Sequence, residues 1–370
     1  MSGLRRTPLY QTHLELGGRM VAFAGFEMPV QYRSIKAEHT AVRERVGLFD
    51  VSHMGQIHLR GPDAVATVER LVTCPVASLR PGRVRYGCLC NHEGGVVDDV
   101  TVYRIGDDHL FLCVNAANIE KDLDWIRRHA PDGARVDDRS DETALLALQG
   151  PAAAPLLAAL AGAELSDLKR FRFREATLAG RQVLISRTGY TGSDGFELYL
   201  ESGGAEAVFR ALLDSGERFG ITPAGLGARN TLRLEAALPL YGQELDDATS
   251  PLEARLDRFV KLESGGFIGA EAIARRRSRG HPRLLAGFVL EQPGVARHGH
   301  PIAVDGKEVG VVTSGGPSPT LGKSIGLGYV PPALAAAGSG FDVLVRGKAI
   351  RARVVETPFV RGQGRPAGAG

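Results

Sequence analysis

The sequence predicts an α+β protein whose C-terminal third forms a small β-barrel or sandwich. Over the first two thirds, β-branched and apolar runs alternate with segments of helical periodicity, as in sheets that carry helices on one face. From about residue 284, short strand-like runs recur at regular spacing between Gly and Pro, which is typical of small all-β domains. A chain of 370 residues is also too long for one ordinary core, so two or three domains are expected.

The elements follow from these periodicities, taken in chain order. The first half is predicted to contain helix 37–46, an extended segment over 48–57, helix 63–73, a hairpin of strands 84–91 and 96–103, strand 109–114 and helix 116–129. The middle is predicted to contain strand 144–148, a helix ending at 160, strands 181–188 and 196–201, helix 205–219 and a helix from about 225 to 237. The last third is predicted to contain strands 284–291, 308–313, 324–330, 341–346 and 349–357.

Two adjacent carboxylates interrupt the strand over 96–103. Gly94 and Gly95 supply a turn, and Asp98 and Asp99 follow inside the β-branched run. Successive side chains of a strand point to opposite faces, so both carboxylates cannot face water if one side packs on a core. One of them should be buried or line a cavity, where loss of solvent raises its pKa and suits it to proton handling. The alternative is a frayed strand start with both carboxylates solvated.

Two glycine-rich segments invite a phosphate-binding interpretation. In residues 187–195 a strand follows the glycines, whereas a phosphate site needs a helix N-terminus, so a long hairpin loop that places Tyr190 and Glu197 near a ligand is preferred. Residues 316–324 resemble a P-loop, but the spacing is one residue off, two prolines lack N–H donors, and a strand follows. Nucleotide binding is therefore not expected at the second segment, and the phosphate-binding interpretation of the first is the weaker of its two.

Composition narrows the function classes further. The net charge is only +3, and the basic run Arg275–Arg277 is typical of the solvated end of a helix, so no nucleic-acid partner is expected. Four cysteines have neither disulfide-framework nor metal-site spacing, which predicts reduced thiols and no metal. No signal core or apolar stretch of about 18 residues is present, which predicts a cytoplasmic protein without a membrane partner. His53 is a candidate base or ligand, although a structural role is commoner for a lone histidine.

Taken together, eight segments spread over nearly the whole chain resemble the aminomethyltransferase (T-protein) family of the glycine cleavage system. The segments, in order, are 7–10 (TPLY), 49–54 (FDVSHM), 94–99 (GGVVDD), 186–192 (SRTGYTG), 226–229 (LGAR), 240–244 (LYGQE), 318–322 (SPTLG) and 358–361 (PFVR). No single motif carries the resemblance, which is specific because all of them occur in the family's order.

The resemblance implies a clover-leaf of three domains around a central channel that binds folate. Domain 1 would comprise residues 1–52 plus 138–255, domain 2 residues 53–137 with the aspartate pair, and domain 3 residues 256–370, which would be β-barrel-like with a mobile tail after about residue 361. The reaction implied is transfer of the methylene of an aminomethyl group from the lipoyl arm of H-protein, an acidic carrier, to tetrahydrofolate. The products would be 5,10-methylenetetrahydrofolate, ammonia and the dihydrolipoyl carrier.

Family site positions map onto single residues of this chain. The essential carboxylate falls on Asp99, and no metal is implied. The positions that bind tetrahydrofolate, the co-substrate, fall on Met54, Tyr86, Asn115, Tyr190, Glu197 and Arg229. The glutamate tail of folate needs a cation, for which Arg361 and Arg365 are both candidates.

The chain departs from the family pattern at two positions, and two other functions stay open beside the transferase. Asn230 stands where an aspartate usually follows the arginine, and Phe26 replaces a common tryptophan. One rival is a tetrahydrofolate-dependent demethylase of the same superfamily, which would keep the folate residues and change the donor pocket. The other is a non-catalytic folate-binding iron–sulfur assembly factor. Such factors carry a cysteine just before the Tyr-Gly-Gln-Glu motif, and residues 239–244 contain none.

Overall fold

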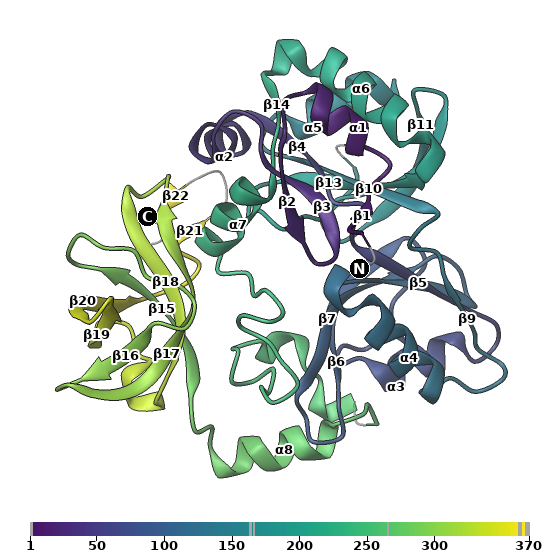
Figure 1. Cartoon of the computed structure of the whole chain (residues 1–370). Coiled ribbons are helices and arrows are strands. Elements are labelled where there is room, and N and C mark those ends of the chain that lie inside the picture. The colour runs from purple at the N-terminus through teal and green to yellow at the C-terminus, as the bar shows by residue number, and fades with distance from the viewer. Residues whose placement is uncertain (1–2, 163–164, 166, 265, 362–364, 367–370) are drawn as a thin grey trace. The chain divides into compact units, whose positions relative to one another are not determined.

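The computed structural model describes residues 3–162, 165, 167–264, 266–361 and 365–366 (Figure 1). The chain forms two compact units. The first comprises Met1–Glu69, Val76–Tyr86 and Val100–Asn230, and the second comprises Arg70–Pro75, Gly87–Asp99 and Thr231–Gly370. The division into three domains stays a prediction.

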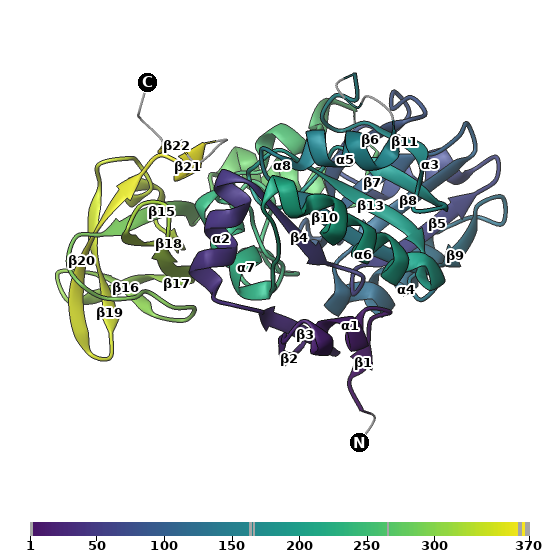
Figure 2. The same cartoon turned by 90° about the horizontal axis from the view of Figure 1, so that it is seen from above.

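The first unit opens with a small sheet that the sequence did not predict. Its strand order is β1-β3-β2, with β1 (Arg5–Arg6), β2 (Arg19–Phe23) and β3 (Phe26–Gln31), and helix α1 (Tyr10–Glu15) lies beside it (Figure 2). Arg5 and Arg6 pair with Phe26 and Glu27 of β3. These strands are short and mixed in polarity, so they lack the alternation that identifies a half-buried strand.

A six-stranded sheet forms the main core of the first unit, in the order β11-β12-β13-β10-β4-β14. Its strands are β4 (Val46–Asp50), β10 (Thr143–Gln149), β11 (Phe173–Leu178), β12 (Arg181–Ser186), β13 (Gly195–Glu201) and β14 (Ile221–Pro223). The helices of this part are α2 (Ile35–Glu44), α5 (Ala153–Ala161), α6 (Ala205–Gly216) and α7 (Leu226–Glu235). Helix α2 begins before the predicted start because the Ser34 side chain caps it, accepting a hydrogen bond from the Ala37 N–H at 3.2 Å.

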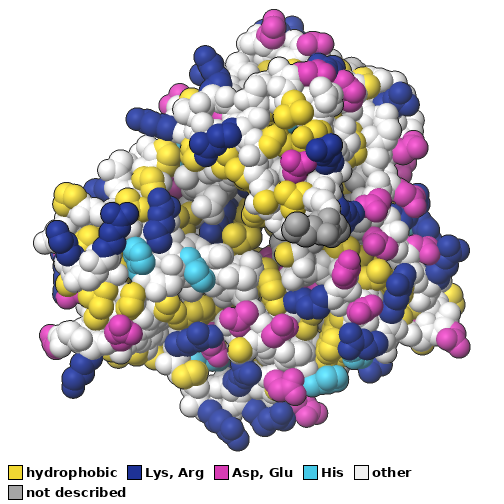
Figure 3. All heavy atoms as spheres, in the orientation of Figure 1, with side chains coloured by type: hydrophobic (Ala, Val, Ile, Leu, Met, Phe, Trp, Pro, Cys, Tyr) yellow, Lys and Arg dark blue, Asp and Glu magenta, His cyan; other side chains and the backbone are white. Residues whose placement is uncertain are grey.

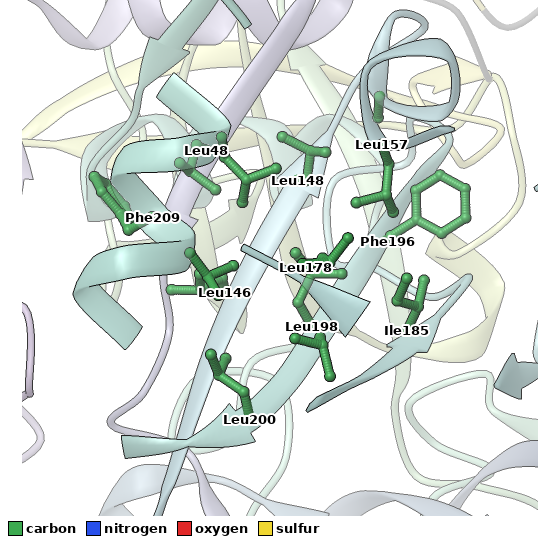
Figure 4. Close-up of a cluster of buried hydrophobic side chains, with 14 of the residues drawn as sticks. Leu48, Leu146, Leu148, Leu157, Leu178, Ile185, Phe196, Leu198, Leu200 and Phe209 are labelled. Atoms are coloured by element: carbon green, nitrogen blue, oxygen red, sulfur yellow. The ribbon is translucent and has the colours of Figure 1, made fainter. Parts of the chain in front are cut away.

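Apolar side chains from this sheet meet α5 and α6 in one buried cluster. Leu146 and Leu148 of β10 lie beside Leu198 of β13, with Leu157 of α5 and Phe209 of α6 in the same cluster (Figure 4). All are fully buried. Because β10 and β13 are central and packed on both sides, their sequences read as nearly continuous apolar runs, and polar residues on them are exceptions that need an explanation.

A five-stranded sheet has the order β6-β7-β8-β5-β9. Its strands are β5 (Gly55–Arg60), β6 (Arg83–Cys90), β7 (Val96–Arg104), β8 (His109–Val114) and β9 (Arg135–Asp138), and α3 (Ala64–Leu71) and α4 (Ile119–His129) accompany it. The predicted hairpin of β6 and β7 is present. At its turn Gly94 has a φ of +80°, and a Cβ on Gly95 would overlap the Asp247 carbonyl, so both positions require glycine.

The C-terminal part of the second unit is a closed barrel, in the order β15-β18-β17-β16-β19-β20. The strands are β15 (Leu284–Leu290), β16 (Pro301–Val304), β17 (Lys307–Ser318), β18 (Lys323–Val330), β19 (Gly340–Val345) and β20 (Lys348–Val355). The expected α+β class with a C-terminal β-barrel is therefore confirmed. Because the six strands close on themselves, this part is a barrel and not a sandwich. Strand β16 was missed, and β17 runs five residues beyond its predicted end at Thr313.

The second unit contains three segments for which the sequence made a prediction: the P-loop-like segment, the basic triplet and the C-terminal tail. The P-loop-like segment joins β17 to β18 without a helix, as predicted, and Ser318 and Thr320 donate hydrogen bonds to the buried Glu235 carboxylate. The basic triplet lies in α8 (Ala270–Arg279), whose end gathers basic side chains at the surface (Figure 3). Of the tail expected to be mobile, only Arg365–Pro366 is described; it forms β22 and pairs with β21 (Val360–Arg361), and the rest lies outside the described residues.

One prediction of an element is wrong. Residues 48–57 do not form one extended segment, because β4 ends at Asp50 and β5 begins at Gly55 in a different sheet. The Asp50 carboxylate accepts a hydrogen bond from the Ser52 N–H at 2.8 Å, which turns the chain. His53 and Met54 therefore lie in a connecting turn and not within a strand.

Candidate functional site

Glu197 is a carboxylate in the middle of β13, whose other carboxylate, Glu201, lies exposed at the end of the strand. Strand β13 lies between β12 and β10, where Glu197 pairs with Ser186 on one side and Ala147 on the other. Residues 187–194 connect β12 to β13, so the predicted long hairpin loop is confirmed. The two ends of this hairpin loop bring Thr188 and Glu197 close together.

A chain of hydroxyl groups leads to the Glu197 carboxylate. The Thr188 hydroxyl donates to Glu197 Oε2 at 2.5 Å, and Thr188 Oγ1 lies 3.3 Å from the Tyr103 hydroxyl. The Tyr199 hydroxyl donates to Tyr103 at 2.9 Å. Burial raises the pKa of Glu197, while the Thr188 hydrogen bond and the Arg229 charge oppose that shift. The site therefore holds a half-buried carboxylate whose charge depends on these two neighbours.

Tyr190 and Arg229 come together beside this carboxylate. The Arg229 guanidinium of α7 lies over the Tyr190 ring, with the carbon of the guanidinium 4.6 Å from the ring centroid. Stacking of this kind holds a cation against an aromatic face while leaving the guanidinium edge for other partners. Because Arg229 also acts on the pKa of Glu197, the three predicted folate residues Tyr190, Glu197 and Arg229 form one group, the Glu197 cluster.

Buried polar side chains fix the loop that carries Tyr190. The Gln149 amide, fully buried at the end of β10, donates to the Thr188 and Phe196 carbonyls and accepts from the Thr191 hydroxyl at 2.9 Å. From α2, Arg43 donates to the Thr191 carbonyl at 2.7 Å. A loop held on several sides in this way presents its side chains in one geometry, as a binding site requires.

Two further candidates lie at one end of the five-stranded sheet. Gly55 of β5 pairs with Val114 of β8 in an antiparallel register. Met54 and Asn115 are the next residues beyond this pair, so they occupy neighbouring positions at the end of the two strands, and both are half-buried. Tyr86, also half-buried, lies on β6 of the same sheet.

His53, adjacent to Met54, is nearly fully buried at 2% exposure. Its ring makes edge contacts with Phe23 and Phe26, at centroid distances of 5.6 and 6.3 Å. Burial and, to a smaller extent, the Arg229 charge together lower the pKa of His53 to about 4, against the opposing effect of Asp50. The imidazole is therefore neutral at pH 7.

The aspartate pair on β7 is split between two environments, as alternation requires. Asp98 is fully buried, and Asp99 is half-buried. The expectation that one of them is buried is confirmed, and the alternative of two solvated groups is wrong. In the same unit, burial raises the pKa of the Cys88 thiol well above its usual value, and the nearby Cys90 and Asp99 add to the shift. Cys88 is thus a protonated thiol and not a nucleophile.

Metal, disulfide and membrane features can be stated for the described residues. All four cysteines are free and buried. No group of three or more His, Cys, Asp or Glu in the described part of the chain is arranged to hold a metal ion. None of the described helices has the length and hydropathy of a membrane span. Arg361 is exposed and lies 3.8 Å from Glu356, whereas the Arg365 side chain is outside the described residues.

Comparison with known families covers both units. The GCVT N-terminal domain model matches residues 9–264, and the glycine cleavage T-protein C-terminal barrel domain model matches residues 283–361. The chain belongs to the glycine cleavage T-protein family. The aminomethyltransferase of Rubrobacter xylanophilus is 52% identical over 97% of this chain and 95% of its own length. The aminomethyltransferase of Bacillus subtilis is 45% identical over 97% of this chain and 99% of its own length.

The fold agrees with this family. The crystal structure of the glycine cleavage system aminomethyltransferase T from Bartonella henselae matches with a TM-score of 0.91 and 35% identity, over 98% of this chain and 99% of that one. The T-protein resemblance derived from the motifs is thereby confirmed, and the chain is an aminomethyltransferase.

Several residues that contact or support the candidate site were not found from the sequence. Thr188 was part of a quoted motif but was given no role, and Gln149, Arg43, Tyr103 and Tyr199 were not singled out. A usable signal existed for one of them: Gln149 is the polar end of an apolar strand that packs on both faces. The others act through contacts with residues far away in the chain, which no local pattern reveals.

Proposed function

We propose that this aminomethyltransferase takes the aminomethyl group from the lipoyl arm of H-protein and uses tetrahydrofolate as the acceptor. The observation that carries the acceptor is the Glu197 cluster, a half-buried carboxylate with a stacked Tyr190–Arg229 pair beside it. The amino and ring N–H groups of a pterin form a paired donor edge, which a carboxylate accepts in bidentate fashion. Arg229 favours the charged form of Glu197 and so supports this pairing.

The reaction has a simple balance. The methylene leaves both its sulfur and its amine and becomes bonded to N5 and N10 of the folate, whose two N–H protons end on the thiol and on ammonia. N5 attacks a methylene that becomes electrophilic as ammonia leaves, so positive charge develops near N5 and N10. A fixed anion stabilises that charge, and much of the acceleration comes from holding the two reacting atoms in contact.

We assign the role of that anion to Asp99. On β7 it is the half-buried member of the pair, whereas Asp98 is fully buried. A carboxylate at this position also accepts or returns protons during transfer. Met54, Tyr86 and Asn115 are assigned to folate binding by the family resemblance, and either Arg361 or Arg365 to the glutamate tail.

The proposal also covers the cellular compartment of the enzyme and its binding partners. The free thiols support a reducing compartment, the cytoplasm, and the partners are lipoylated H-protein and tetrahydrofolate. The decisive experiment incubates the protein with aminomethyl-loaded H-protein and tetrahydrofolate and measures methylenetetrahydrofolate and ammonia in equal amounts. Folate binding without product from H-protein, but with product from a small methyl donor, would indicate the demethylase. Folate binding with neither product would indicate the assembly factor.

A further inference from the structure

The His53 imidazole carries a polar atom that the folded protein leaves unsatisfied. Nδ1 is buried and has no hydrogen-bond partner among the described residues. Such atoms are rare, because removing a polar group from water without replacing its hydrogen bond raises the free energy of the folded state. A ring needed only for packing against Phe23 and Phe26 would not require this nitrogen.

The turn that carries His53 is held firmly in place. Asp50, at the end of β4, accepts hydrogen bonds from the Ser52 N–H at 2.8 Å and the Thr7 hydroxyl at 2.6 Å, and it pairs with His13 at 2.8 Å. The Ser52 hydroxyl in turn accepts from the Leu145 N–H at 3.0 Å. A loosely held loop could rotate a polar ring toward water, but this turn is fixed on both sides of Asp50.

His53 also connects two groups of candidate folate residues. It directly precedes Met54, which lies beside Asn115 at the end of β5 and β8. It is close enough to Arg229, a member of the Glu197 cluster, for the guanidinium to influence its protonation. All of these residues belong to the first unit.

We propose that His53 is a further binding residue for tetrahydrofolate, with Nδ1 hydrogen-bonded to a polar atom of the bound reduced pterin. The inference rests on the proposed function, since it takes tetrahydrofolate as the ligand. A neutral imidazole has one donor and one acceptor nitrogen, so it suits the neutral polar atoms of a pterin, whereas the charged Glu197 suits its paired donor edge. The competing explanation is a buried water that satisfies Nδ1 whether or not folate is bound.

Two substitutions distinguish the contribution of the His53 ring from that of its Nδ1 atom. His53→Phe keeps an aromatic ring against Phe23 and Phe26 and removes both nitrogens. His53→Asn loses the ring but holds a polar atom at the same distance from the backbone as Nδ1. Tetrahydrofolate binding is measured by titration calorimetry under reducing conditions, and the unfolding temperature of each unliganded variant by scanning calorimetry.

The two variants are expected to differ in opposite ways, one in its affinity for tetrahydrofolate and the other in its unfolding temperature. His53→Phe should bind tetrahydrofolate about three- to tenfold more weakly at an unchanged or higher unfolding temperature, because one hydrogen bond is lost and an unsatisfied atom is removed. His53→Asn should unfold at a lower temperature and keep an affinity within about threefold of the parent protein.

Two outcomes would overturn the assignment. Affinity of His53→Phe within twofold of the parent would leave the nitrogen without a role in binding, as the buried water predicts. Equal loss of affinity in both variants would show that the nitrogen's position is irrelevant. A parent protein that does not bind tetrahydrofolate would instead overturn the proposed function, so the two failures are distinguishable.

Discussion

Glu197→Gln should stabilise the unliganded protein and weaken its binding of tetrahydrofolate. Burial raises the pKa of Glu197, which means that the ionised carboxylate is disfavoured in the folded state relative to the unfolded chain. An amide of the same size carries no charge to desolvate and keeps an oxygen that can accept from the Thr188 hydroxyl, which now donates at 2.5 Å. Removing the charge therefore removes a cost of folding.

The sign of the pH dependence follows from linkage. A carboxyl whose pKa is higher in the folded than in the unfolded state binds more protons when folded, so its contribution to stability is lost as pH rises through the folded pKa. The variant has no such group. The difference in unfolding temperature between Glu197→Gln and the parent should be near zero below about pH 4 and should grow in favour of the variant toward pH 8.

Binding should change in the opposite direction. Toward the paired donor edge of a pterin the amide presents one acceptor and one donor, so one of two hydrogen bonds is replaced by a donor facing a donor. Leaving one buried hydrogen-bonding group unmatched costs about 1–3 kcal/mol. That energy corresponds to a dissociation constant for tetrahydrofolate about 5- to 150-fold higher.

Scanning calorimetry from pH 4 to 8 and titration calorimetry with tetrahydrofolate at pH 7.5 measure both effects. Glu201→Gln is the matched control, because Glu201 lies on the same strand but is exposed, and it should change neither quantity. Two results would refute the reasoning. A variant less stable than the parent at pH 8 would mean that attraction to Arg229 outweighs burial, and unchanged affinity would remove the pterin from Glu197.

Three further predictions concern catalysis, the loop and the partner. Asp99→Asn should lower turnover at least ~100-fold while folate affinity stays within a few fold; near-normal turnover would remove Asp99 from the mechanism. Gly189→Ala should weaken folate binding and lower the unfolding temperature, since its Cβ would overlap Gln149 Oε1, whereas Gly203→Ala, with open space at its Cβ, should do neither. The KM for aminomethyl-loaded H-protein should rise with ionic strength, because screening over roughly 10 Å at 0.1 M weakens steering between charged surfaces, and the KM for tetrahydrofolate should change much less. Equal salt sensitivity of both constants would contradict electrostatic docking.

Local periodicity in the sequence determines many elements of this protein. The β-branched run after Gly94 and Gly95 produces β7, and its alternation requires one aspartate of the pair to be enclosed. The regular Gly- and Pro-punctuated runs after residue 284 produce the barrel strands. Such features depend on neighbours two to four residues apart, which is the range that propensity and periodicity describe.

The motifs also indicated which residues belong to the site, but not how they are arranged. Tyr190, Glu197 and Arg229 each lie within or beside a segment typical of T-proteins. That the Arg229 guanidinium of α7 stacks on a tyrosine from a hairpin loop is visible only in the structure. Residues roughly forty positions apart in the sequence meet only because the sheet and α7 fold onto one another, and local patterns contain no information about that contact.

Three outcomes were decided by tertiary structure alone. Asp98, and not Asp99, faces the core, since alternation specifies only that the two differ. The extended segment over 48–57 breaks after Asp50, because that carboxylate gathers hydrogen bonds from Thr7, His13 and Ser52 and so turns the chain out of one sheet before it enters another. Gln149 and Arg43 fix the Tyr190 loop from distant strands and helices. In each case the deciding partner is a long-range one, and only the folded chain brings it within hydrogen-bonding distance.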